Sequence, residues 1–257
     1  MIRPLSYVLN GQVIMARHVN LDALIPREDF DITDASRPVG TRKGTLSITD
    51  LKYGEFFFTA VRKPDFQRET SEWDSAKVVG FIESFLTGDL IPAAILWQNP
   101  SYTFVIDGAH RLSSLAAWIN DDYGDGDISK RFYDSALPEE QLDIAAKTRT
   151  SVNKKLGSYK DHILALESPE KVKPEVLAAA KRLGVLSIQL QWVEGDATKA
   201  EHSLVKINQL ASPIDSTEMK VLQARRTPIG IAARAIARSG KGHKYWSNFS
   251  PENIEKL

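Results

Sequence analysis

The chain of 257 residues contains no cysteine. Disulfide bonds, zinc sites with thiolate ligands and cysteine nucleophiles are therefore excluded, and the absence agrees with a reducing compartment, so we expect a cytoplasmic location. The sequence also has no apolar run long enough to span a membrane. Pro4 and Asn10-Gly11 interrupt the amino-terminal segment in which a signal peptide would need a continuous apolar core. We therefore expect no membrane partner.

An excess of charge is missing as well. The 33 basic and 33 acidic side chains cancel, so any contact with nucleic acid has to come from a local basic patch. Two nucleotide-binding signatures are absent, the Walker-type glycine-rich loop and the Gly-x-Gly-x-x-Gly motif. The five histidines are scattered along the sequence, at His18, His110, His162, His202 and His243. This spacing argues against an autonomous metal nuclease.

The most informative stretch of the sequence runs from Thr103 to Trp118. An apolar run rich in aromatic and β-branched residues predicts a strand that ends at Asp107-Gly108. A helical pattern begins directly afterwards, with one apolar face made of Leu112, Leu115, Ala116 and Ile119. The stretch therefore predicts a strand, a tight turn and the start of a helix.

The start of this predicted helix has the chemistry of an anion site. The first backbone N–H groups of a helix lack internal partners, and together with the helix dipole they favour a phosphate. Arg111 can clamp phosphate oxygens, His110 can donate to one or accept a proton, and Asp107 can hold a metal ion or orient the arginine. The alternative is a plain Asp-Gly exit from a strand followed by a solvated arginine. We favour the functional interpretation, because an arginine opposes the dipole at this end of a helix.

Further elements are predicted on both sides of this stretch. Asn10-Gly11 within VLNGQVI predicts a β-hairpin, Ser47 with Asp50 predicts a short capped helix, and the aromatic run EFFFTAV predicts a strand. Residues 26–45 lack periodicity and predict a mobile, locally basic loop, and DDYGDGD after Asn120 predicts a solvated acidic linker. The remaining patterns predict helices over 75–87, 139–156 and 174–183 and strands over 93–97 and 186–193.

Several motifs in this order resemble a known family. They are an FQR at Phe66 to Arg68, a nearby Trp73, a Gly-x-x-Ile-Pro that ends at Pro92, and the IDGAHRLSSL of the central stretch. Together they resemble the N-terminal domain of GmrSD-type modification-dependent restriction enzymes, whose usual central motif is Asp-Gly-Gln-Gln-Arg. This chain departs from it at Ala109 and His110. Its His-Arg pair is similar to the phosphate-binding motifs of sulfiredoxins and of the DGQHR proteins associated with phosphorothioate DNA modification.

The resemblance continues to about Leu222. HSLVKINQL and IDSTEMKVL are similar to the later signature of the family, an Asn at the end of one helix and a Glu that opens the next, here Asn208 and Glu218. The fold it implies is α+β, with a ParB/sulfiredoxin-like small mixed sheet and a mainly helical second half. We accordingly expect a first domain over 1–125 that carries the motif and a helical subdomain over 126–257.

The function implied by the resemblance is nucleotide binding, with slow phosphoanhydride hydrolysis, in a bacterial or phage-related DNA defence or DNA modification system. Backbone groups of Gly108, Ala109 and His110, with Arg111, would hold the phosphates of a nucleoside triphosphate. Arg68 would add positive charge in the transition state. Gln67 would orient water or read the base, Asn208 would close the pocket, and Asp107 with Glu218 would bind Mg²⁺. In this family the nuclease resides in a partner half with paired histidines, so a nuclease partner protein is an expectation, and a homo-oligomer stays open.

A basic tract lies beyond the resemblance. Between residues 220 and 244 the charges are all positive in an otherwise neutral chain, which suits the phosphates of duplex DNA, although a solvated face is the plainer interpretation. The residues we expect to contact DNA are Arg225, Arg226, Arg234, Arg238, Lys241 and Lys244. Two other functions stay open: a non-enzymatic DNA-binding regulator that senses a ligand in the same pocket, and a ParB-like nuclease that acts directly on DNA.

Overall fold

The fold is α+β, as predicted, and is built around a mixed six-stranded sheet. A computed structural model describes residues 6–9, 12–15, 18–28, 30, 42–64, 67, 70, 73–211 and 227–228, with side chains from residue 18 to 207 and at 227–228. Within these ranges no helix is long and apolar enough to cross a membrane.

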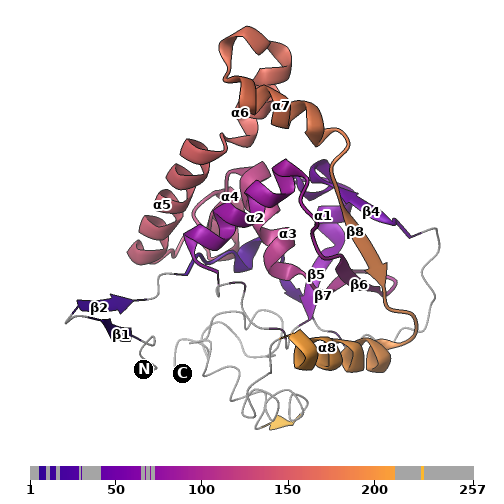
Figure 1. Cartoon of the computed structure of the whole chain (residues 1–257). Coiled ribbons are helices and arrows are strands. Elements are labelled where there is room, and N and C mark those ends of the chain that lie inside the picture. Colours follow the sequence, from indigo (N-terminus) through magenta and orange to yellow (C-terminus); the bar gives the residue numbers. More distant parts are fainter. Residues whose placement is uncertain are drawn as a thin grey trace.

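The elements follow one another along the chain as Figure 1 shows. The strands are β1 (Ser6–Leu9), β2 (Gln12–Met15), β3 (Arg27–Glu28), β4 (Thr45–Ser47), β5 (Val61–Pro64), β6 (Ala94–Gln98), β7 (Thr103–Asp107) and β8 (Ser187–Trp192). The α-helices are α1 (Phe56–Ala60), α2 (Ser75–Thr87), α3 (Ala109–Asn120), α4 (Asp127–Phe132), α5 (Glu139–Lys155), α6 (Tyr159–Glu167), α7 (Pro174–Leu183) and α8 (Ala197–Ala211). Short 3-10 helices are η1 (Asp22–Leu24), η2 (Ile48–Leu51) and η3 (Pro169–Lys171).

The sheet has the strand order β3-β5-β7-β6-β8-β4. Strands β3, β5 and β7 run parallel to one another. Strand β6 forms an antiparallel hairpin with β7 and pairs in parallel with β8, and β4 closes the far edge antiparallel to β8. The carboxyl ends of β3, β5 and β7 therefore lie at one edge of the sheet, which we call the carboxyl edge.

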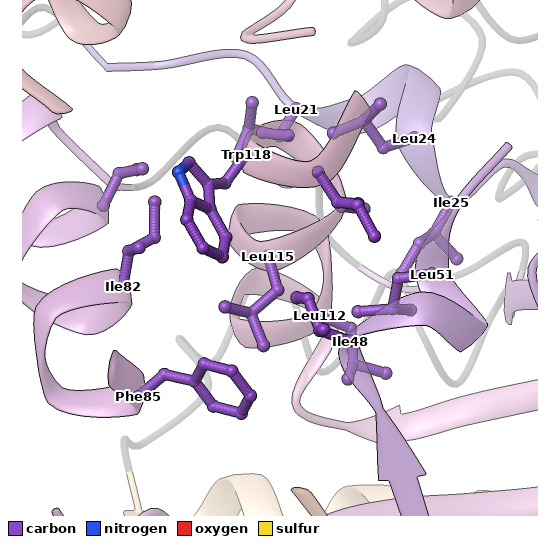
Figure 2. Packing of buried hydrophobic residues seen from close by; sticks show 14 of the residues in the cluster. Leu21, Leu24, Ile25, Ile48, Leu51, Ile82, Phe85, Leu112, Leu115 and Trp118 are labelled. Atoms are coloured by element: carbon purple, nitrogen blue, oxygen red, sulfur yellow. The ribbon is translucent and has the colours of Figure 1, made fainter. Parts of the chain in front are cut away.

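Two hydrophobic cores cover the two faces of the sheet. The larger core packs α2, α3 and α5 on one face, and Figure 2 shows Trp118, Leu115 and Ile82 at its centre. The smaller core lies on the other face, where Phe104 and Trp97 pack against Phe30 and against Ala200 and Leu204 of α8. In Figure 1, α8 accordingly lies across the sheet from α2 and α3. Neighbouring residues of β7 point to opposite cores, Val105 to the larger and Phe104 to the smaller.

The elements with strong local signals form as predicted. Helix α2 spans the predicted residues, begins with Asp74 accepting from the amide of Lys77, and ends at Gly88 in the left-handed conformation with φ of 81°. The hairpin β1–β2 and the capping box of Ser47 and Asp50 are present. Strand β8 alternates as expected, with buried residues separated by exposed ones. The strand, turn and helix of the central stretch are β7, Gly108 and α3.

The predicted strand over EFFFTAV is wrong. Residues 56–60 form helix α1, and only Val61 belongs to a strand, β5. The three consecutive aromatic residues do not alternate between two faces: Phe58 is buried, Phe57 is partly buried and packs against the larger core, and Phe56 is 93% exposed. Phe56 and Phe58 would share one face of a strand, whereas a helical turn directs residues i and i+2 to different sides. A helix therefore accommodates one exposed and one buried phenylalanine at these positions.

One segment predicted to be irregular is ordered, and a second is ordered at its two ends. DDYGDGD is not a solvated linker, because Asp122 is buried and accepts from the amides of Gly124, Gly126 and Ser129. Arg149 of α5 binds the carboxylates of Asp121 and Asp125 on the outside of the same turn. The predicted basic loop over 26–45 is wrong at its two ends, because Arg27 and Glu28 form β3 and because β4 begins at Thr45. Residue 29 and residues 31–41 of this predicted loop lie outside the described residues.

The boundary that we expected between residues 125 and 126 stays a prediction. Strand β8 comes from the second half of the chain and lies between β6 and β4 in the sheet. The sheet therefore draws strands from both sides of the expected boundary. The helices of the second half are placed differently: Figure 1 shows α5 leading to α6 and α7, which lie beyond the sheet at the top of the view.

His162 joins α6 to the core. Its side chain is fully buried, its ring meets Trp118 of α3 edge to face at 5.0 Å, and its Nδ1 lies 2.8 Å from the carbonyl oxygen of Ser158. Burial lowers the pKa of His162 below its ordinary value of 6.5, against smaller opposing effects of the Ser158 carbonyl and Asp161. The folded protein therefore favours the neutral imidazole.

This preference predicts a pH dependence of stability. The unfolded chain binds a proton at the ordinary pKa of 6.5, and the folded chain only at a lower pH. The stabilisation is therefore present above pH 6.5 and is lost as the pH falls below it. We expect His162→Asn, which keeps a donor for Ser158 but cannot titrate, to remove this component. Urea midpoints measured between about pH 8 and pH 5 test this, and parallel profiles of parent and variant would contradict it.

Candidate functional site

The site lies at the carboxyl edge of the sheet. Val61 of β5 pairs with Thr103 of β7, and Arg27 of β3 pairs with Lys63 of β5. The segments that follow β5 and β7 therefore leave the sheet side by side. One contains the family's Gln67 and Trp73, and the other is the Asp-Gly-Ala-His-Arg turn. Sheets with parallel strands hold ligands at this edge, so the topology brings together two motifs that lie about forty residues apart in the sequence.

The turn is built around Gly108. Asp107 ends β7, Gly108 has φ of 101°, and α3 begins at Ala109. The first helical hydrogen bond runs from the amide of Leu112 to the carbonyl of Gly108 at 2.9 Å. Among the described residues no side chain caps α3, and its first turn contains no acidic residue. The helix start therefore keeps the positive end of its dipole toward the carboxyl edge.

Arg111 lies folded back over this turn. Its Nη2 donates to the Asp107 carboxylate at 2.5 Å, and its Nη1 donates to the Pro92 carbonyl at 3.0 Å. A Cβ placed on Gly108 would meet Nη2 at 3.0 Å, so the guanidinium rests directly on the glycine. The Arg111 side chain is 13% exposed and that of Asp107 is 41% exposed. Of the two roles that we considered for Asp107, the structure contains the contact that orients the arginine.

His110 stacks on Trp73. The two rings are 5.6 Å apart and inclined by 21°. Trp73 in turn meets Phe81 of α2 edge to face at 5.6 Å, and Nζ of Lys77 lies 5.5 Å from the Trp73 ring centre. The imidazole is therefore held against an aromatic surface that comes from the other motif. The sequence placed Trp73 within the resemblance but did not indicate this contact.

A buried charged cluster beside the site was missed. Asp22, Arg27 and Lys63 are 5%, 4% and 0% exposed. The carboxylate of Asp22 accepts from both cations and, at 3.1 Å, from the amide of Thr70. Burial raises the pKa of Asp22, but the charges of Lys63 and Arg27 outweigh it and hold the pKa well below its usual range. No sequence pattern indicated this cluster, because it depends on the pairing of β3 with β5.

The remaining predicted residues are placed only in part. Asn208 lies in the last turn of α8, which covers the opposite face of the sheet from α3, and its side chain is outside the description. No group of three or more histidine or acidic side chains that could hold a metal occurs in the described ranges. The predicted residues outside these ranges are Arg68, Glu218, Arg225, Arg226, Arg234, Arg238, Lys241 and Lys244.

Residues 48–218 match a protein-family model described as GmrSD restriction endonuclease, N-terminal domain. The match covers most of the chain, including β5, β7 and the turn. The chain belongs to this family. No curated protein and no solved structure matches it. Membership makes the chain a domain of a DNA restriction system and implies an interaction with DNA. The predicted resemblance is thereby confirmed, and Asp22 and Arg27 lie ahead of the matched residues.

The geometry of the turn predicts that the glycine at position 108 stabilises the fold. We expect Gly108→Ala to lower the free energy of unfolding by about 1–2 kcal/mol, because a Cβ is strained in the left-handed region, and because it would press on Arg111. Gly80→Ala is the matched control: Gly80 lies inside α2 with no atom near the position of a Cβ, so alanine should be neutral or stabilising. Equal denaturation midpoints for Gly108→Ala and the parent would contradict this account of the turn.

Proposed function

We propose that this domain binds a nucleoside triphosphate at the carboxyl edge and hydrolyses it slowly as part of the restriction system. The observation that carries the proposal is the start of α3 at Gly108, which no described side chain caps, directly beside a half-buried arginine and a histidine. A helix start of this kind binds phosphate groups through its amides. The chain has no other recognisable nucleotide-binding loop.

Arg111 would act through a guanidinium group whose position is already fixed. Asp107 and the carbonyls of Pro92 and Ala93 hold the guanidinium by its two terminal nitrogens. Among the described residues, no hydrogen bond uses Nε–H or the second Nη1–H, so these are the donors that would be offered to a phosphate oxygen. A preorganised donor of this kind stabilises developing charge at little cost. Arg111 would therefore contribute both to binding of the nucleotide and to stabilisation of the transition state of hydrolysis.

His110 would serve as the proton-transfer group. Its ring is held by Trp73, so its nitrogens keep a fixed direction relative to the helix start. A histidine can exchange a proton near neutral pH, which fits activation of water or protonation of a leaving phosphate. Gln67 and Arg68, on the segment after β5, would then orient the water and add positive charge.

We propose Mg²⁺ as the companion of the nucleotide. Mg²⁺ commonly uses one or two protein carboxylates together with phosphate oxygens and water, and Asp107 supplies a half-exposed carboxylate at the turn. Bound there, the ion would neutralise phosphate charge. Glu218 would be the second carboxylate.

DNA is the second ligand that we propose. The restriction family is the observation that favours it, and the basic tract between residues 220 and 244 provides the charge. Cleavage would then be the task of a nuclease partner, with the nucleotide site controlling it. A regulator that senses a nucleotide without hydrolysis, and a ParB-like nuclease that acts on DNA directly, are the rival functions.

Calorimetric titration with each nucleoside triphosphate and Mg²⁺ separates these functions. We expect saturable binding of at least one triphosphate, followed by release of inorganic phosphate over many turnovers. Binding without phosphate release would favour the sensor. An absence of binding for all of them would refute the proposed nucleotide site and leave direct action on DNA.

Two variants of the turn separate anchoring from proton transfer. Arg111→Lys keeps the charge but loses the planar fork, and we expect it to weaken nucleotide binding roughly 10- to 100-fold, since hydrogen bonds to charged groups contribute about 1.5–3 kcal/mol. His110→Gln restores the usual family residue and keeps a donor, so binding should persist while the pH dependence of phosphate release changes.

The matched control for Arg111→Lys is Arg131→Lys. Arg131 donates to the hydroxyl of Tyr53, whose amide binds Asn120 at the other end of α3. Binding should be unaffected there. Parent-like affinity in a folded Arg111→Lys protein, checked by circular dichroism, would show that the arginine is only a structural clamp.

A further inference from the structure

Residues 19–28 precede the part of the chain that matches the family, yet they contact the site. The amide of Val19 donates to the carbonyl of Trp73 at 2.8 Å, and the amide of Leu21 donates to the carbonyl of Thr70 at 3.0 Å. Both acceptors belong to the segment between β5 and α2, which carries the family's Gln67 and Trp73. We call Pro64 and the described residues Gln67, Thr70 and Trp73 the Gln67 segment.

Arg27 and Lys63 each bind Asp22 and the Gln67 segment at the same time. Arg27 donates from Nη1 to Asp22 and from Nε to the carbonyl of Gln67 at 3.3 Å. Lys63 donates from Nζ to Asp22 and to the hydroxyl of Thr70 at 2.7 Å. The Asp22 carboxylate also accepts from the Thr70 amide. The cluster therefore fixes the Gln67 segment at two points that are three residues apart.

The geometry of such a cluster is strongly defined. Three ionised groups taken out of water are tolerated only where each is paired and hydrogen-bonded, and the loss of one contact leaves a buried charge unsatisfied. The segment cannot shift without breaking at least one of these contacts. The consequence reaches the turn, because the Gln67 segment ends at Trp73, on which His110 stacks.

We propose that Arg27 and Asp22 are positioning residues of the site: they hold the Gln67 segment so that Gln67 and Trp73 face the turn at Asp107 to Arg111. The amino-terminal residues 19–28 are thus a working part of the site. The role of the site rests on the proposed nucleotide hydrolysis, whereas the ordering of the segment does not.

Positioning differs from general support of the fold in what a mild substitution changes. Arg27→Lys keeps a cation for Asp22 but removes the planar fork that reaches Asp22 and Gln67 together. If Arg27 only supported the fold, Arg27→Lys would weaken β3, β5 and the core alike. If Arg27 positions the Gln67 segment, Arg27→Lys would loosen that segment and slow the hydrolysis of the nucleotide, while the start of α3 would still bind the nucleotide.

Amide hydrogen exchange and steady-state kinetics on the full chain test this. Two amides report on the segment, those of Gln67 and Thr70, which donate to the Pro64 carbonyl and to Asp22. The amide of Leu112 reports on α3. In Arg27→Lys we expect exchange at Gln67 and Thr70 to rise about 10-fold or more with Leu112 unchanged, and kcat to fall about 10-fold with KM within about twofold of the parent.

Arg62→Lys is the matched control. Arg62 neighbours Lys63 on β5 but points to the other face, where it contacts Glu28 and the ring of Tyr102. It should leave exchange and kcat unchanged. Unchanged exchange in Arg27→Lys, an equal rise at Leu112, or faster exchange with a parent-like kcat would each overturn the proposal. If the parent releases no phosphate from any triphosphate, the proposed function fails, and exchange at Gln67 and Thr70 alone decides whether Arg27 positions the segment.

Discussion

The parallel pairing of β5 with β7 is the constraint on which the site depends. Because both strands end at the same edge of the sheet, the segment after β5 and the turn after β7 leave it side by side. His110 and Trp73 can then stack although they are far apart in sequence. The buried cluster of Asp22, Arg27 and Lys63 secures the first of these segments. Arg111 secures the second by donating to the carbonyls of Pro92 and Ala93, directly before β6.

Arg111 illustrates how structure and function share one side chain. It joins the end of β7 to the residues before β6 and covers Gly108, so it belongs to the fold. It also lies in the first turn of α3, where it belongs to the proposed chemistry. Its replacement by alanine would affect both, and a substitution that keeps the charge is therefore more informative.

Local signals predicted much of this structure. Helix α2 is specified by residues inside it or next to it: the capping Asp74, the apolar spacing and Gly88. Asp107 and Gly108 likewise specify the turn between β7 and α3. Long-range pairing decided the rest. Arg27 fell within the predicted loop over 26–45, because its partners Asp22 and Lys63 meet it only once β3 joins β5. The aromatic run before β5 looked like a strand because its apolar content conceals that Phe56 faces solvent.

The central claim is that the start of α3 receives the phosphates of a nucleotide. The most direct measurement is a titration of isotopically labelled protein with a non-hydrolysable triphosphate analogue and Mg²⁺, followed through the amide resonances. We expect the largest saturable shifts at Ala109, His110 and Arg111, with a second set at Gln67, because these amides lie at the carboxyl edge. Saturable shifts elsewhere with these amides unmoved, or no shifts with any triphosphate, would contradict the claim.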